Sequence, residues 1–105
     1  TVANVRADVY CVFTNRTPSA AMRGFGVMPA SFAIEMQMDR VAKAIGMDPW
    51  QLRLKNAFRN GDMKAHRRAV WDAALVETIQ AAARLSGTDL PEEYRRMSSE
   101  KRVAG

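Results

Sequence analysis

The first hydrophobic pattern in the chain is an alternation over residues 2–14. One set of alternate positions is apolar or small, and the other set is mostly polar or charged. The apolar set is Val5, Ala7, Val9, Cys11 and Phe13. A period of two is typical of a strand with one buried face. The pattern therefore predicts a strand over residues 2–14, with Cys11 as a small core residue.

A loop is predicted next, over residues 15–28. Asn15, Pro18 and Ser19 are residue types that favour turns. Two glycines follow at Gly24 and Gly26, where the backbone can turn tightly. The loop is expected to end close to Pro29, because proline suits the first turn of a helix.

Helical spacing dominates the rest of the chain, over residues 29–100. Apolar positions recur every three or four residues from Ala30 to Ile45, and Gly46 is a favourable helix end. Asp48 followed by Pro49 is typical of an N-cap and a first helical residue. The predicted second helix ends at Asn60-Gly61, the third runs from Leu75 to about Gly87, and the fourth starts at Pro91.

These patterns predict an α+β fold, in which an α-rich piece carries one N-terminal strand, a Gly-rich loop and three to four helices. A lone strand needs neighbours, because a stable sheet has about three strands. We therefore expect the 105 residues to be a single section of a larger domain, an expectation that the start at Thr1 without Met also favours. The isolated piece is expected to self-associate along the strand.

The overall charge is basic, with 16 Lys and Arg against 11 Asp and Glu and a net charge of +5. Such a balance raises the hypothesis of a nucleic-acid or membrane-surface partner. Most of these cations, however, are interleaved with acidic residues on the predicted helices, as on a solvated helix face. No signal peptide and no long apolar run is present in the sequence.

Cys11 and His66 are the single cysteine and the single histidine. Zinc and iron–sulfur sites need several such ligands, so the sequence predicts no Cys/His metal site within the chain. One cysteine also allows no internal disulfide, which suits a cytoplasmic protein. His66 is expected to be solvated in an exposed basic loop.

The loop holds the most informative residues, Arg23-Gly24-Phe25-Gly26. Arg23 offers a planar, permanently charged fork that suits phosphate or oxyanion groups. Phe25 can present a flat apolar face to a ring. The alternatives are structural: Arg23 in a surface ion pair, and Phe25 in the core. The pattern favours a loop that holds an anionic group beside an aromatic one.

The stretch from Thr14 to Gly26 closely resembles the molybdenum hydroxylase family, the xanthine dehydrogenases and aldehyde oxidases. The resemblance is strong over residues 9–62 and continues in the family's order and spacing through Phe32-Ala33, Glu35, Met38-Asp39, Ala42, Gly46-Met47-Asp48-Pro49, Arg53, Asn56 and Gly61-Asp62. Gly24-Phe25-Gly26 favours the hydroxylase branch over the carbon monoxide dehydrogenase branch. One departure is Met28-Pro29-Ala30, where most relatives carry a Pro-Gln pair.

The resemblance implies that the chain is part of a molybdenum-binding subunit. Arg23 and Gly24 would then contact molybdopterin, in its cytosine dinucleotide form, and Phe25 would pack against the substrate ring. Members of this family hydroxylate a heterocycle or an aldehyde with oxygen from water. Electrons leave through [2Fe-2S] clusters to FAD, which lie on other segments or subunits.

The resemblance also implies what this chain lacks. The family's catalytic glutamate belongs to a segment beyond residue 105, and Glu35 does not correspond to it. We therefore assign no catalytic residue and no metal ligand here, and we expect the isolated piece to be inactive and without molybdenum. Its partners would be the remaining molybdopterin-binding segments and the iron–sulfur and flavin subunits or domains.

A rival interpretation is a small basic RNA-binding module. Arg23-Gly24-Phe25-Gly26 matches the first four positions of the RNA-recognition signature. The signature then requires stacking aromatics, whereas this chain continues with Val27-Met28-Pro29-Ala30. Pro29 would also interrupt a central strand.

Overall fold

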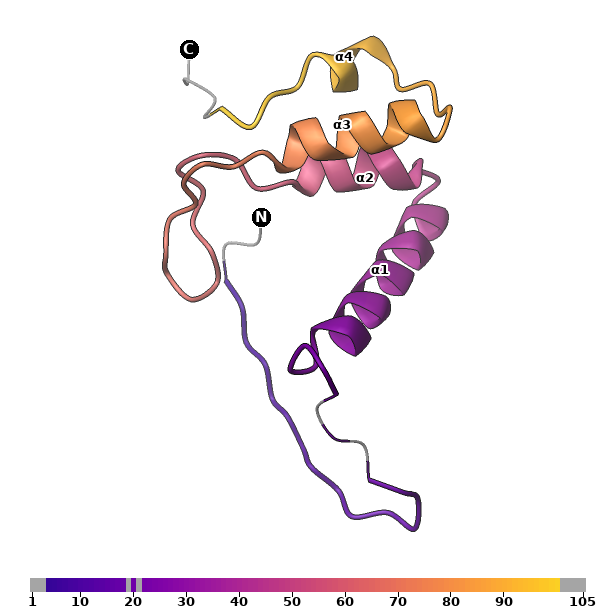
Figure 1. Cartoon of the computed structure of the whole chain (residues 1–105), viewed down its shortest axis with the longest axis vertical. Coiled ribbons are helices and arrows are strands. Elements are labelled where there is room, and N and C mark those ends of the chain that lie inside the picture. The colour runs from indigo at the N-terminus through magenta and orange to yellow at the C-terminus, as the bar shows by residue number, and fades with distance from the viewer. Residues whose placement is uncertain (1–3, 19, 21, 101–105) are drawn as a thin grey trace.

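The computed structural model describes residues 4–18, 20 and 22–100. In these residues the regular elements are the helices α1 (Val27–Ala44), α2 (Pro49–Asn56), α3 (Leu75–Leu85) and α4 (Glu92–Arg95). Figure 1 shows α2 and α3 side by side, with the α4 segment along α3 and α1 leaving at an angle. α1 contacts α2, and α2 contacts α3.

The helix boundaries follow from local chemistry. The Asp48 carboxylate caps α2 by accepting the backbone N–H groups of Trp50 and Gln51, at 2.9 and 3.1 Å. Gly46 adopts a positive φ of 66° directly after α1, and the Met47 N–H donates back to the Ala42 carbonyl. The predicted start and stop signals at Asp48 and Gly46 are therefore confirmed. α1 starts at Val27, slightly earlier than the predicted 29.

The core lies between α2, α3 and the segment that carries α4. It consists of the buried side chains Leu54, Ala57, Val76, Ala83 and Leu90, with Trp50, Ile79, Tyr94 and Met97 packed against them. Leu54 and Val76 are fully buried. Burial of apolar area at roughly 25 cal/mol per Å² is the main stabilising contribution here.

Two polar side chains of α3 attach the C-terminal segment to this core. The Gln80 amide donates to the backbone carbonyls of Tyr94 and Met97, at 2.8 and 2.9 Å. The Glu77 carboxylate accepts both the Ser99 hydroxyl, at 2.5 Å, and the Ser99 N–H, at 2.8 Å. These hydrogen bonds from Ser99 lower the pKa of Glu77 from 4.5 to about 2.

Glu77→Gln is expected to weaken this attachment and to lower the free energy of unfolding near pH 7. The expected loss is about 1 kcal/mol, because the carboxylate stays in contact with water. The pKa of Glu77 is lower in the folded chain, so its stabilising contribution is complete above about pH 4.5 and is lost as the pH falls through about 2. Urea unfolding should therefore separate wild type from variant at neutral pH and bring them together in acid. A difference that persisted unchanged at about pH 2 would contradict this account.

The predicted N-terminal strand is wrong, and with it the α+β class. Residues 4–14 are extended but belong to no sheet in the described part of the chain. The pairing that the described residues do contain is a single isolated bridge between Met63 and Ala69. The described fold is thus helical. Residues 2, 3, 19, 21 and 101–105 of the predicted segments lie outside the described residues.

The physical reason is that alternation of apolar and polar residues only determines which side chains share one face of a strand. A strand also needs a neighbouring segment that forms hydrogen bonds with its backbone. No described segment pairs with residues 4–14, and their apolar side chains are left in solvent, with Val9 88% and Phe13 107% exposed. Cys11 is exposed as well, so its predicted place in a core is wrong. Self-association of the isolated piece stays a prediction.

Among the described residues, no helix combines the length and the apolar composition that crossing a bilayer requires.

Candidate functional site: the Arg-Gly-Phe-Gly loop

The loop before α1 has an unusual backbone. Gly24, Phe25 and Gly26 are three consecutive residues with positive φ, at 102°, 55° and 84°. The Phe25 N–H donates to the Met22 carbonyl at 3.0 Å, and the Val27 N–H donates to the Gly24 carbonyl at 3.1 Å. Positive φ is disfavoured for a bulky residue such as Phe25 and costs roughly 1–3 kcal/mol. Strain of this kind concentrates at binding sites.

The two side chains of the loop both face solvent. Phe25 is 93% exposed, so it is no part of the core in the described chain. Arg23 is exposed, and no carboxylate of the described residues lies within ion-pairing distance of it. The loop therefore presents a guanidinium and an aromatic ring, with neither of them used in internal packing.

The glycines leave open space beside these side chains. A Cβ atom placed on Gly24 or on Gly26 would meet no atom within 4 Å. A ligand can therefore approach the backbone closely at this point. An anionic group with a flat ring system, as molybdopterin has, fits this combination of guanidinium, open backbone and aromatic face.

The helix that follows the loop is braced by an ion-pair cluster. Arg53 of α2 lies 2.6 Å from a Glu35 carboxylate oxygen and 2.9 Å from one of Asp39, both on α1. Partial burial opposes the charge, but hydrogen bonds to these carboxylates raise the pKa of Arg53 above its ordinary value. Glu35 is thus a surface partner of Arg53.

The ion pairs of Arg53 with Glu35 and Asp39 are connected to the loop through α1. The Ala30 N–H donates to the Gly26 carbonyl at 3.2 Å, so the last loop residue already belongs to the hydrogen-bonding pattern of the helix. Fixing α1 against α2 therefore fixes the base of the loop. This cluster could not be predicted from the sequence, because its members are 14 and 18 positions apart (53 − 39 and 53 − 35) and no local periodicity reports such a contact.

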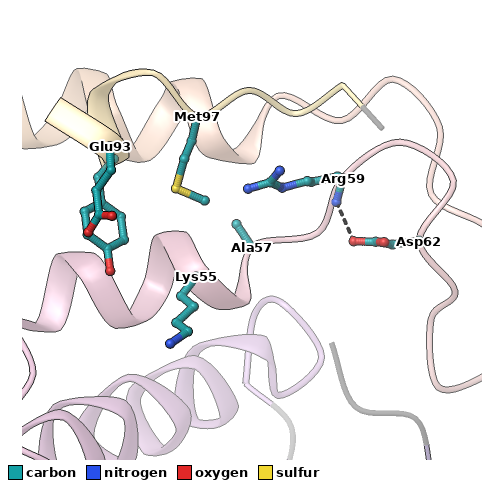
Figure 2. Close-up of a pocket in the computed structure, with 7 residues that line it drawn as sticks. Lys55, Ala57, Arg59, Asp62, Glu93 and Met97 are labelled. Atoms are coloured by element: carbon teal, nitrogen blue, oxygen red, sulfur yellow. Dashed lines mark hydrogen bonds between the residues drawn. The ribbon is translucent and has the colours of Figure 1, made fainter. Parts of the chain in front are cut away.

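A cavity lies elsewhere, between the end of α2 and α4 (Figure 2). It has a volume of about 630 Å³ and is lined by Lys55, Ala57, Arg59, Asp62, Glu93, Tyr94 and Met97. None of these residues belongs to the Arg-Gly-Phe-Gly loop. No motif or periodicity in the sequence indicates this cavity.

Comparison with known proteins supports the resemblance. Residues 1–57 match the family described as "Molybdopterin cofactor-binding domain". The large molybdopterin subunit of nicotinate dehydrogenase from Eubacterium barkeri is 44% identical over 82 residues, which cover 77% of this chain and 19% of that protein. No solved structure matches the chain significantly.

Two further relatives are an aldehyde oxidoreductase and a xanthine dehydrogenase subunit by name. The aldehyde oxidoreductase of Megalodesulfovibrio gigas is 44% identical over 61 residues, or 58% of this chain and 7% of that protein. The putative xanthine dehydrogenase molybdenum-binding subunit of Escherichia coli is 35% identical over 74 residues, or 70% and 10%. The chain thus spans less than a fifth of the length of these relatives.

The family match over residues 1–57 includes the loop and the helices α1 and α2, and none of these comparisons supports an RNA-binding module. The chain belongs to the molybdopterin cofactor-binding domain family.

Proposed function

We propose that this chain contributes the cofactor- and substrate-contacting loop to the molybdenum-binding subunit of a hydroxylase of the xanthine dehydrogenase and aldehyde oxidase type. The observation that carries the proposal is the strained Gly24-Phe25-Gly26 turn with Arg23 exposed beside it, in a chain of this family. Such a turn costs conformational energy, and binding a ligand against it would account for that cost.

Each residue has a role that its chemistry supports. The Arg23 guanidinium donates charge-assisted hydrogen bonds to anionic oxygens of the cofactor. Gly24 lets the backbone approach the cofactor without a side chain between them. Phe25 orients a flat heterocyclic or aldehyde substrate by stacking or edge-on contact. The cofactor, when bound, supplies the redox chemistry. These residues bind the cofactor and orient the substrate.

The remainder of the enzyme lies outside these residues in this proposal. Residues 1–105 form one section of a larger molybdopterin-binding domain, and the catalytic base is on another segment. The cofactor is the cytosine dinucleotide form, and [2Fe-2S] clusters and FAD belong to other segments or subunits. The enzyme is cytoplasmic. The isolated chain is inactive and holds no stoichiometric molybdenum.

A matched pair of glycine substitutions tests the proposal. Gly24 and Gly87 both have positive φ, and a Cβ at either position meets no atom within 4 Å, but Gly87 follows α3. Ala at each position should cost roughly 1 kcal/mol or somewhat more through backbone strain. In the full-length protein, Gly24→Ala should also lower molybdenum and pterin content several-fold, because its methyl group occupies the space of the cofactor.

The measurement is metal analysis together with thermal denaturation of both variants. Gly87→Ala should show the loss of stability with cofactor content close to wild type. Full molybdenum content in Gly24→Ala would contradict the proposed approach of the cofactor to this backbone.

A further inference from the structure

A second exposed feature lies in residues 61–70, which fold back on themselves and which we call the basic hairpin. The Val70 N–H donates to the Asp62 carbonyl at 2.8 Å, and the Lys64 N–H donates to the Arg68 carbonyl at 2.9 Å. Its base is held by the Asp62 carboxylate, which accepts the Arg59 N–H at 2.8 Å. The shape of the basic hairpin is therefore supported by hydrogen bonds of its own.

Its tip carries positive charge that the chain does not neutralise. Arg67 and Arg68 are exposed, and Lys64 is partly exposed. In the part of the chain that the structure describes, none of the three pairs with a carboxylate. Neighbouring like charges repel one another, so this arrangement disfavours the free hairpin and favours binding of an acidic partner.

The cavity of Figure 2 lies at the base of the basic hairpin, because its lining includes Asp62 of the hairpin and Arg59, whose N–H the Asp62 carboxylate accepts. In Figure 2 the Arg59 side chain extends into the space between Met97 and Ala57. Tyr94 and Met97 give the cavity an apolar wall, and Lys55 adds a second cation. The cavity thus suits an apolar or aromatic side chain that is flanked by acidic groups.

The combined surface is strongly asymmetric in charge. It holds five cations, three on the tip (Lys64, Arg67 and Arg68) and two in the cavity (Lys55 and Arg59), against two carboxylates, Asp62 and Glu93. Asp62 is already engaged by the Arg59 N–H. The difference of three positive charges is more than half of the net charge of +5 of the whole chain.

We propose that the basic hairpin and the cavity at its base dock an acidic segment of a partner protein, which inserts an aromatic side chain between Tyr94 and Met97. A nucleic acid or an anionic membrane would use the cations alone. The apolar wall of the cavity instead favours a peptide, because an aromatic side chain can cover Tyr94 and Met97 while its acidic neighbours lie at the cations of the tip. This docking is independent of the molybdenum chemistry.

The test uses the complete polypeptide that contains this chain and two labelled peptides. Both peptides are poly-glutamate, with one central phenylalanine in the first and one central alanine in the second. Fluorescence anisotropy should show that the phenylalanine peptide binds more tightly and that added salt weakens both complexes. Single-stranded RNA and phosphatidylserine vesicles serve as the competing probes.

A charge-reversal pair supplies the matched control. Arg67→Glu combined with Arg68→Glu should weaken peptide binding by about tenfold or more. Arg40→Glu combined with Lys43→Glu makes the same change of charge on exposed positions of α1 and should leave the affinity near wild type. Arg59→Ala removes one of the two cavity cations and should weaken binding, while the backbone N–H of residue 59 can still donate to Asp62. Circular dichroism confirms that each variant is folded.

Four results would overturn the proposal. These are no measurable peptide binding, equal losses in the two charge-reversal variants, equal affinity of the two peptides, and tighter binding of RNA or vesicles than of the phenylalanine peptide. None of these experiments depends on cofactor content. This proposal can therefore fail while the proposed function holds, and the reverse is also true.

Discussion

Arg23→Ala is expected to leave the full-length enzyme with little molybdenum and with turnover reduced on the order of a hundredfold or more. The substitution removes a charge and a bidentate hydrogen-bond donor that no carboxylate of the described residues engages. Arg23→Lys should restore little, because an ammonium group cannot reproduce the planar fork. Metal analysis and steady-state kinetics measure both effects.

Arg16→Ala is the matched control for this experiment. Arg16 is an exposed arginine earlier in the same loop, and its backbone N–H donates to the Thr14 hydroxyl. Removing its side chain should change neither metal content nor turnover appreciably. Full molybdenum content and full turnover in Arg23→Ala would show that this loop does not hold the cofactor.

The second large effect is expected at Phe25. Phe25→Ala should leave molybdenum content near normal and weaken turnover of flat aromatic substrates, because it removes a stacking surface and no cofactor contact. The expected cost is roughly 1–3 kcal/mol in the free energy of the transition state. The measurement is kcat/KM for an aromatic substrate and for a small aliphatic aldehyde. Phe25→Ala should lower kcat/KM more for the aromatic substrate than for the aldehyde.

Two further substitutions separate the ring of Phe25 from its strained backbone. Phe25→Tyr keeps the ring and should keep most of the aromatic turnover. Phe25→Gly relieves the positive φ of 55° but also removes the ring, so it should lose turnover while it gains backbone stability. If Phe25→Gly retained aromatic turnover, the backbone and not the ring would matter at this position.

The helices were largely predictable because their ends depend on local chemistry. Asp48 accepts N–H groups two and three residues ahead, and Gly46 and Gly87 take positive φ directly after α1 and α3. Such signals require no knowledge of the remaining chain. The end of α2 was less well predicted, since the helix stops at Asn56 and not at Asn60-Gly61.

Features that depend on distant partners were not predictable in the same way. The alternation over residues 2–14 indicated a strand, but the backbone has no pairing segment in the described chain. The contacts of Arg53 with Glu35 and of Glu77 with Ser99 join residues 18 and 22 positions apart. Neither periodicity nor motif spacing determines which helix faces will meet.

The candidate site has features that local sequence predicts and features that it does not predict. Arg23, Gly24 and Phe25 were found from sequence because they are adjacent and form a recognisable pattern. Their assignment to cofactor and substrate stays a prediction. The left-handed turn through Phe25 was not foreseen, because a bulky residue rarely adopts positive φ. The cavity at the basic hairpin combines residues from 55 to 97, so no local pattern revealed it.

The distribution of buried side chains has a consequence for cooperativity. In the described residues, the first buried side chain is Ala42, and the hydrophobic cluster draws on residues 54 to 90. The part of the chain that contains α2, α3 and α4 can therefore unfold and refold as one cooperative unit. The ion pairs of Arg53 with α1 connect this unit to the loop. Amide hydrogen exchange in α2 and α3 will then report global unfolding, whereas amides near residues 22–26 will exchange through shallow local openings. If the loop binds a ligand as proposed, its amides should gain protection against exchange while those of α2 and α3 keep theirs.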